Sequence, residues 1–180
     1  MIQKILSKMR LFRRGQSGFT LIELMATLGI CGIIGVGVTM ANAQLIRQTV
    51  RNNDYTTANR QVLNAMRWIS HDAQMAQSIE NWENFPASDN LTLTWETWDN
   101  LDVEVVYSMD SELQLRRTCT VEGSPPQVIL IAQYVDIDPA ASYCNWDNEE
   151  LTLTLTGSVG EGASVINVTR LNTTANRSKL

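Results

Sequence analysis

The hydrophobic and polar positions of this 180-residue chain follow three successive patterns. Residues 19–43 are almost continuously apolar, and 25 helical residues would span roughly 37 Å, enough to cross a hydrocarbon core with some tilt. In residues 44–85 the apolar positions recur at spacings of three and four, which is typical of a helix with one face on a core. From residue 86 to 180 the spacing becomes two, the period of half-buried strands.

The apolar stripe of the second segment predicts an amphipathic continuation of the first helix. No Gly or Pro interrupts it before Pro86, so we predict one long helix that runs from the apolar segment to residue 85. The stripe consists of Tyr55, Ala58, Val62, Ala65, Met66, Ile69, Ala73, Ala76 and Ile79.

Alternation in the third segment predicts a series of antiparallel strands joined by short turns. Turns are expected at residues 98–100 and 110–111, and a loop at 122–126. One helix followed by a run of antiparallel strands makes an α+β domain, with the sheet covering the apolar face of the helix. The expected strands contain residues 91–95, 103–107, 113–117, the more continuously apolar 128–135, and a final pair formed by 151–155 and 165–171.

The first 18 residues carry the charge pattern of a cytoplasmic leader. They contain Lys4, Lys8, Arg10, Arg13 and Arg14 but no acidic residue, an asymmetry that keeps a segment on the cytoplasmic side of a membrane. An ordinary secretory leader would place its apolar stretch before the processing point, whereas here the stretch follows it.

The net charge of the chain is more negative when the 18-residue leader is left out. The whole chain has 14 basic and 19 acidic residues, a net charge of -5, but without the five basic residues of the leader the balance is 9 minus 19, or -10. Such acidity argues against a nonspecific nucleic-acid surface, which needs clustered Lys and Arg. It suits an exported head formed by residues 86–180.

The junction of leader and apolar helix reads Gly18-Phe-Thr-Leu-Ile-Glu23-Leu. This stretch resembles the prepilin leader of type IV pilins and type II secretion pseudopilins. The resemblance implies that a prepilin peptidase cuts between Gly18 and Phe19 and methylates the new amine of Phe19. It also implies the pilin architecture, the bacterial inner membrane with a cytoplasmic N-terminus, and partners among other pilin subunits and an inner-membrane assembly platform. A plain signal anchor with an incidental Glu23 is the alternative.

Glu23 is the predicted assembly residue. It lies four residues after Phe19, about 6 Å along a helix axis, so the Phe19 amine of a neighbouring subunit could meet its carboxylate. Each charge is costly alone in an apolar surrounding, and pairing would select one stagger between subunits. Alternatively, the carboxylate extends to the lipid headgroups.

Small residues recur at intervals of four within the apolar segment, which puts them on one ridge where helices can approach closely. They are Thr27, Cys31, Gly35, Thr39 and Ala43. A second, weaker resemblance concerns residues 60–79, which are similar to the helix of J-type pseudopilins and W-type minor pilins. It favours a minor subunit over the main building block.

Cys119 and Cys144 fall in the exported region, and we predict that they form a disulfide under oxidising conditions. Such a bridge would close about 25 residues and remove about 3.5 kcal/mol of unfolded-state entropy on the chain-entropy model. Two unpaired thiols are the alternative. Cys31, in the membrane segment, is expected to pack as a small apolar residue.

Catalytic and metal-binding signals are weak. His71, the single histidine, is interpreted as a solvated helix residue that cannot face its neighbours Ser70 and Asp72. Asp136, Asp138 and the acidic run 147–150 could supply oxygen ligands to Ca²⁺, which some pseudopilins bind, but their spacing matches no defined loop. We therefore expect no metal, no cofactor and no enzymatic activity. The five tryptophans, 68, 82, 95, 98 and 146, are interpreted as core and sheet packing.

These patterns leave two rivals to a pilin or pseudopilin subunit. One is a membrane-anchored binding or enzymatic domain whose anchor only resembles a prepilin, which processing at Gly18 would exclude. The other is a competence pseudopilin for DNA uptake, disfavoured by the acidic head because no direct nucleic-acid contact is expected from it.

Overall fold

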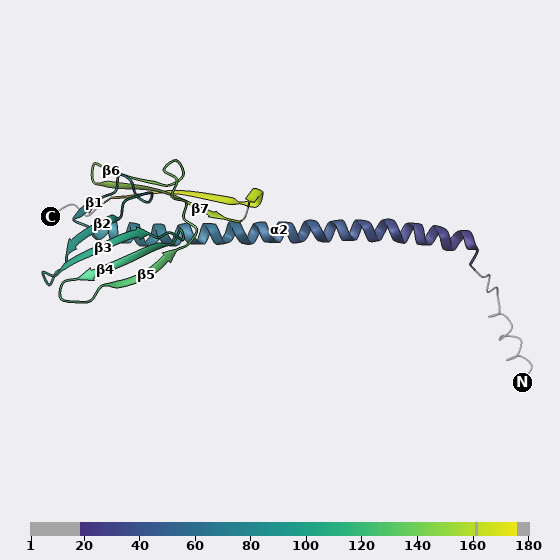
Figure 1. The fold of residues 1–180 in the computed structure, drawn as a ribbon, viewed down its shortest axis with the longest axis horizontal. Coiled ribbons are helices and arrows are strands. Elements are labelled where there is room, and N and C mark those ends of the chain that lie inside the picture. The colour runs from purple at the N-terminus through teal and green to yellow at the C-terminus, as the bar shows by residue number, and fades with distance from the viewer. Residues whose placement is uncertain (1–18, 161, 176–180) are drawn as a thin grey trace, which may run out of the picture. The chain divides into compact units, whose positions relative to one another are not determined.

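The fold is built on α2 (Leu21–Met75), a 55-residue helix that contains both the apolar segment and most of the amphipathic stripe (Figure 1). The computed structural model describes residues 19–160 and 162–175 of the chain. It divides into two compact units, residues 1–47 and 48–180, and α2 contributes to each. The second unit contains all the described strands and is called the head below. Unlike the predicted head of residues 86–180, it includes the second half of α2 and β1.

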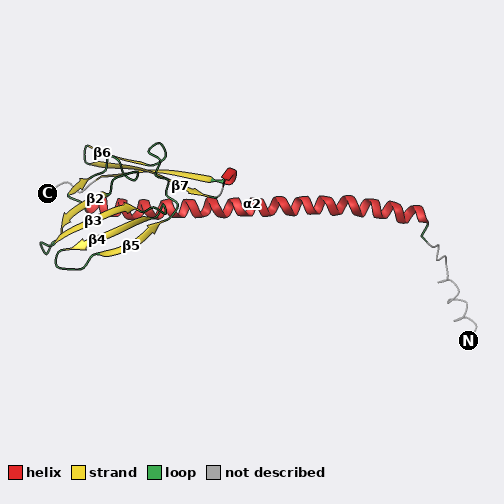
Figure 2. Ribbon diagram, viewed as in Figure 1, coloured by secondary structure: helices red, strands yellow, loops and turns green. Residues whose placement is uncertain are grey.

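The strands of the head form two antiparallel sheets (Figure 2). A 3-10 helix, η2 (Gly162–Ser164), lies between the last two strands. A helix packed against antiparallel sheets confirms the α+β, pilin-like class. The five-stranded sheet has the order β1 (Ser78–Glu80), β2 (Leu91–Glu96), β3 (Asp102–Met109), β4 (Leu115–Val121), β5 (Gln127–Ala132), and the three-stranded sheet has the order β6 (Tyr143–Asp147), β7 (Glu150–Val159), β8 (Ile166–Ala175).

The two sheets are joined by a short bridge beyond β5. Val135 pairs with Gly157 of β7, flanked by hydrogen bonds from Asp136 N to Thr156 O and from Ser158 N to Tyr134 O, both 2.8 Å. The end of α2 contacts both sheets, because Asn64 donates to the carbonyl of Ile131 at 2.6 Å and Asn172 on β8 donates to Ser70 Oγ at 2.5 Å.

The core lies where the apolar stripe of α2 meets the inner faces of the sheets. Eight of the nine predicted stripe residues are buried, and Tyr55 is the exception at 49% exposed. Gly157 permits a close approach of β7 to α2, since a Cβ there would lie 2.8 Å from Cγ2 of Val62 and 3.1 Å from the carbonyl oxygen of Ala58. A side chain at position 157 would therefore force helix and sheet apart.

The helix ends earlier than predicted, at Met75 rather than residue 85. The chain then forms β1, where Gln77 N donates to Thr94 O at 2.8 Å and Ile79 pairs with Leu93. Ile79 is buried, so its predicted place in the core is confirmed, whereas its predicted helical conformation is wrong. An apolar residue three positions after Ala76 also suits the inward side of a short strand, and spacing alone does not separate the two.

Most predicted strands are confirmed, with shifts at their ends. Residues 91–95 and 103–107 lie in β2 and β3, but Leu113 lies in a turn with φ of 57° and β4 begins at Leu115. The segment predicted as 128–135 ends as a strand at Ala132. β6 was not predicted; it pairs with β7 through a two-residue turn in which Asn148 and Glu149 both have positive φ.

Candidate assembly segment and a buried charge cluster

The start of α2 is closed by a reciprocal pair of hydrogen bonds between Thr20 and Glu23. The backbone N–H of Thr20 donates to Glu23 Oε2 at 3.0 Å, and the N–H of Glu23 donates to Thr20 Oγ1 at 3.3 Å. This is a capping box, in which a Thr and a Glu three residues later satisfy two free backbone donors of the first turn. The Thr-x-x-Glu signal is present in the sequence but was not used to predict the helix start.

The cap leaves one carboxylate oxygen of Glu23 without a hydrogen bond among the described residues. Oε2 also accepts from the Thr20 hydroxyl at 2.9 Å, so all three contacts involve Thr20 and the donors to Glu23 meet at Oε2. A carboxylate at a helix N-terminus is stabilised by the positive end of the helix dipole. Glu23 is thus held in one orientation and can still accept a further donor.

The first half of α2 has no partner for its apolar surface within the described chain. Phe19 is 80% exposed and Ile33 77%, and the most apolar 18-residue window has a mean hydropathy of 2.1 with none of it buried. By length and composition this is a helix that could cross a membrane. Gly18, the other residue of the predicted cleavage site, lies outside the described residues.

The predicted ridge of small residues can meet an apolar surrounding without exposing polar groups. The hydroxyl of Thr27 donates to Leu24 O at 2.9 Å and that of Thr39 to Gly35 O at 2.8 Å, so both are satisfied within the helix. A Cβ added at Gly35 would meet no atom within 4 Å. The ridge is therefore open to close approach by another helix.

In the head, Asp72 is buried at the end of α2 and binds two residues of the five-stranded sheet. Tyr107 on β3 donates its hydroxyl to Oδ2 at 2.5 Å, and Arg117 on β4 donates Nε to Oδ2 at 2.6 Å and Nη2 to Oδ1 at 3.2 Å. Tyr107 and Arg117 are cross-strand partners, so their side chains point from one face of the sheet towards the helix. The guanidinium also lies 5.1 Å from the ring centre of Trp68.

The surroundings of Tyr107 and Arg117 raise the pKa of both side chains. Burial, and then the negative charge of Asp72, raise the pKa of Tyr107 far above its ordinary value, so the phenol remains a neutral donor. Burial alone would lower the pKa of Arg117, but the hydrogen bonds and charge of Asp72 outweigh it and raise the pKa. Arg117 therefore stays charged and balances Asp72.

The cluster shows what the sequence analysis missed. His71 Nδ1 lies 3.4 Å from Asp72 Oδ1, so the expectation that adjacent helix residues cannot meet was wrong for this pair. The His71 side chain is 68% exposed, as a solvated histidine should be. Asp72 occupied a core-facing position between Ile69 and Ala73, and a charged residue there is the signal that could have revealed a buried partner.

The predicted disulfide is absent from the structure. Cys119 on β4 and Cys144 on β6 are free thiols in different sheets, and both face the core. Each is therefore accounted for by packing, since a free cysteine behaves as a small apolar residue. Cys31 is exposed on the apolar helix.

The acidic residues considered for Ca²⁺ are engaged in loop contacts. Asp136 Oδ1 accepts from Asp138 N at 3.0 Å, and Asp138 Oδ1 accepts from Ala140 N at 2.9 Å. Within the part of the chain that the structure describes, no group of three His, Cys, Asp or Glu residues has the arrangement of a metal site. Of the tryptophans, 82, 95 and 146 pack against the core, Trp68 is 37% exposed, and Trp98 is 91% exposed, contrary to the packing role predicted for it.

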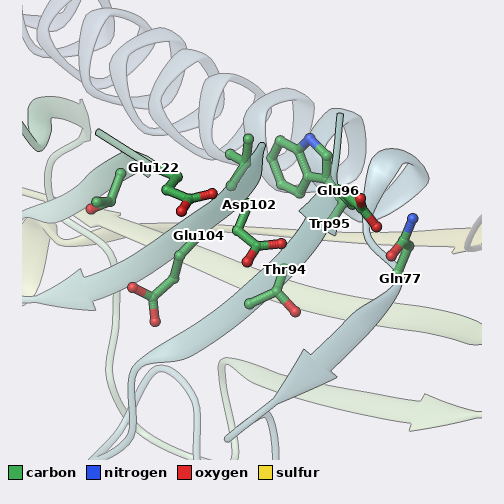
Figure 3. Close-up of a pocket in the computed structure, with 9 residues that line it drawn as sticks. Gln77, Thr94, Trp95, Glu96, Asp102, Glu104 and Glu122 are labelled. Atoms are coloured by element: carbon green, nitrogen blue, oxygen red, sulfur yellow. The ribbon is translucent and has the colours of Figure 1, made fainter. Parts of the chain in front are cut away.

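Two grooves on the head differ in charge. One, of about 480 Å³, lies on β2 and β3, where the carboxylates of Glu96, Asp102, Glu104 and Glu122 gather (Figure 3). The other, of about 400 Å³, lies between α2 and β8 and has arginines but no acidic residue in its lining. Neither was predicted, because each brings together residues far apart in the chain.

Comparison with known protein families gives one match. Residues 13–39 match the family described as the prokaryotic N-terminal methylation motif. No curated protein and no solved structure matches the chain. The chain thus carries a prepilin-type N-terminal methylation motif ahead of a pilin-like α+β arrangement, and nothing in the match supports the J-type or W-type resemblance of residues 60–79.

Proposed function

We propose that this chain is a subunit of a type IV pilus or a type II secretion pseudopilus. It is inserted into the inner membrane with its N-terminus in the cytoplasm, cut after Gly18 by a prepilin peptidase and methylated at Phe19. It then joins other pilin subunits at an inner-membrane assembly platform. The observation that carries the proposal is the methylation motif of residues 13–39, which includes the start of a helix whose apolar surface is uncovered.

The capping box supports a role for Glu23 in assembly. Its carboxylate is oriented by Thr20 and keeps an oxygen that can accept the Phe19 amine of a neighbouring subunit. The amine would otherwise be an unpaired charge in an apolar surrounding, so the contact favours one stagger between helices. The protein acts by assembly rather than by catalysis.

Variants at Glu23 test the proposal. Glu23→Ala removes both the cap and the charge, whereas Glu23→Gln keeps a side chain that can complete a capping box but has no charge. We expect both variants to insert and to be cut after Gly18, and both to be lost from filaments. Glu23→Gln entering filaments at the wild-type level would contradict the charge pairing, since helix capping would then suffice.

Replacing Gly18 by Leu is the matched test of processing. The precursor should remain uncut, and mass spectrometry of the wild-type N-terminus should find methylated Phe19. An intact leader on the wild-type chain, in cells with an active prepilin peptidase, would instead favour a membrane-anchored domain with another function.

The chain is further proposed to be a minor subunit, on the resemblance of residues 60–79 alone. Quantifying its copies per filament relative to the most abundant subunit tests this, because a main building block would account for most of the filament mass.

A further inference from the structure

The hairpin that joins β2 and β3 presents an unusual apolar residue. Trp98 is 91% exposed at its tip. The hairpin tip, residues 96–102, is held by hydrogen bonds from Thr97 N to Leu101 O at 2.9 Å, from Asn100 N to Thr97 O at 3.0 Å and from Leu101 N to Thr97 Oγ1 at 3.1 Å. The indole is therefore carried on an ordered support, and binding through it would lose little conformational freedom.

The hairpin tip is also acidic. Glu96 and Asp102 are cross-strand partners at its base, and Asp99 follows Trp98. All three are exposed, and residues 96–102 contain no Lys or Arg. Figure 3 shows Glu96 and Asp102 among the side chains that line the groove on β2 and β3. The tip is an apolar knob surrounded by negative charge.

The groove between α2 and β8, called the basic groove, has the opposite character. Leu63 on α2 is 40% exposed and Leu171 on β8 is 64% exposed, so it offers apolar surface on both sides. Arg67 and Arg170 also line it. Arg170 is held by Asn59, whose Oδ1 accepts from Nε at 3.1 Å and Nη2 at 2.8 Å, which orients the guanidinium without neutralising it.

Acidic residues predominate in the strand-rich part of the head. Residues 76–160 contain fifteen Asp and Glu but only two basic residues, Arg116 and Arg117, which pair with Asp110 and Asp72. Within residues 19–160 and 162–175, neither Arg67 nor Arg170 forms an ion pair, and the same holds for Arg51 and Arg60 on α2. Arg67 and Arg170 differ in lying together in one groove that has no acidic residue in its lining.

We infer that the basic groove receives the hairpin tip of a second copy of this chain. Trp98 packs between Leu63 and Leu171, and the carboxylates around it face Arg67 and Arg170. Apolar surface and charge both match, and Trp and Arg are the residues that most often dominate binding energy at interfaces. One contact accounts for both the exposed Trp98 and the two arginines of the basic groove that have no acidic partner among the described residues.

The contact is head-to-tail, because knob and groove are different surfaces of the same head. Each copy accepts one neighbour and is accepted by another, which generates an open row rather than a closed dimer. A tryptophan buries about 150 to 250 Å², far below a standard interface of about 1,600 Å². The contact therefore acts together with the helix packing of the proposed filament, on which it rests. It requires adjacent copies of this chain, so a minor subunit present once per filament would not form it.

Crosslinking between two differently tagged full-length chains tests the contact in membranes and in filaments. One chain carries Leu101→Cys in the hairpin tip and the other Gln74→Cys in the basic groove, both in a Cys31→Ser, Cys119→Ser background, so Trp98 and the arginines are kept. With a short bismaleimide we expect at least about tenfold more heterodimer than with a Leu101→Cys and Val128→Cys control pair. Val128 is 56% exposed on β5, away from both surfaces.

Charge exchange makes the test specific. Arg67→Glu with Arg170→Glu in the groove chain should lower the heterodimer about tenfold, and so should Glu96→Arg with Asp99→Arg in the tip chain. Combining the two reversed chains should restore it to within about threefold. Trp98→Ala in the tip chain should also lower it about tenfold.

A yield of heterodimer no higher than in the control pair overturns the inference. So does a failure of the two charge-reversed chains to crosslink when they are combined, which would mean that the groove binds another acidic partner. Processing at Gly18 and filament entry are scored on the same samples. A chain that is cut and assembled but does not crosslink refutes the contact and leaves the proposed function standing. An uncut chain refutes the function instead.

Discussion

Asp72 shows how one buried residue can tie a helix to a sheet. It is 1% exposed and bound by side chains from two neighbouring strands, while Arg117 is 13% exposed at its side chain. A buried ion pair adds little to the free energy of folding compared with apolar packing. Removing one partner is nevertheless strongly destabilising, because the other charge stays largely out of water. The cluster therefore specifies where the end of α2 sits on β3 and β4.

Asp72→Ala is expected to lower the free energy of unfolding by about 3 to 5 kcal/mol. It leaves the largely buried Arg117 without a counter-charge and the buried hydroxyl of Tyr107 without an acceptor. Urea unfolding of the full chain in detergent, followed by tryptophan fluorescence, measures the loss. Asp110→Asn is the matched control: it breaks the ion pair with Arg116, whose side chain is 43% exposed, and should change the midpoint little. Equal losses in both variants would refute the assignment.

Tyr107→Phe should cost less, about 1 to 2 kcal/mol, because it removes one neutral donor and leaves the ion pair. The same unfolding measurement applies. A loss as large as that of Asp72→Ala would mean that the phenol, not Arg117, is the main partner of the carboxylate.

Cys144 is a second residue whose environment makes a measurable prediction. Burial raises the pKa of its thiol from the ordinary value of 9.0 to about 12. At pH 8 this lowers the reactive thiolate fraction about a thousandfold, so iodoacetamide should label Cys144 far more slowly in the native chain than in urea. Because the folded pKa is the higher one, the thiol's contribution to stability is complete below about pH 9 and lost as pH rises towards 12. Native labelling as fast as in urea would contradict this burial.

At the level of elements, the hydrophobic period predicted which residues enter the core better than it predicted where each element ends. The apolar stripe from Ala58 to Ile79 was assigned correctly to the core because burial follows spacing, whatever the backbone does. The end of α2 and the strand β1 could not be predicted, since both depend on pairing with β2, which lies about fifteen residues further on. β6 was missed because Tyr143–Asp147 is only five residues long and its apolar residues, 143, 144 and 146, do not alternate regularly.

Contiguity in the sequence also decides which functional features could be predicted. The methylation motif is contiguous, so a short run of residues was sufficient to identify it. The Asp72 cluster and the basic groove each join α2 to strands far along the chain, and no local pattern encodes those contacts.

The contact of Gly157 with α2 makes a prediction at this scale. Gly157→Ala should lower stability by about 1 to 3 kcal/mol, because its Cβ would overlap Val62 and crowd the backbone of Ala58. Adding Val62→Ala should recover part of the loss, so the double variant should be more stable than the sum of the single losses predicts. Gly37→Ala is the control, since a Cβ there meets no atom within 4 Å. Strict additivity would contradict the overlap.

For the molecule as a whole, the proposed cleavage removes only 18 of 180 residues but doubles the net negative charge. Removal of residues 1–18 takes away five basic residues and no acidic one, so the net charge should change from -5 to -10. Isoelectric focusing in denaturant should therefore resolve precursor and mature chain, with the mature form more acidic. Gly18→Leu supplies the marker for the precursor. Co-migration of the wild-type chain with this marker would argue against cleavage.

The position of Asp72, three residues before the helix ends, also has a mechanical consequence. Tension that enters the head along α2 loads the contacts between helix and sheets in shear, so the hydrogen bonds of Asp72 to β3 and β4 stretch together rather than one after another. Asn64 and Gln61 add parallel attachments at the far end of β5. Tension on α2 would then pull on the head as one body, and the force needed to extract α2 would fall when Asp72 is replaced.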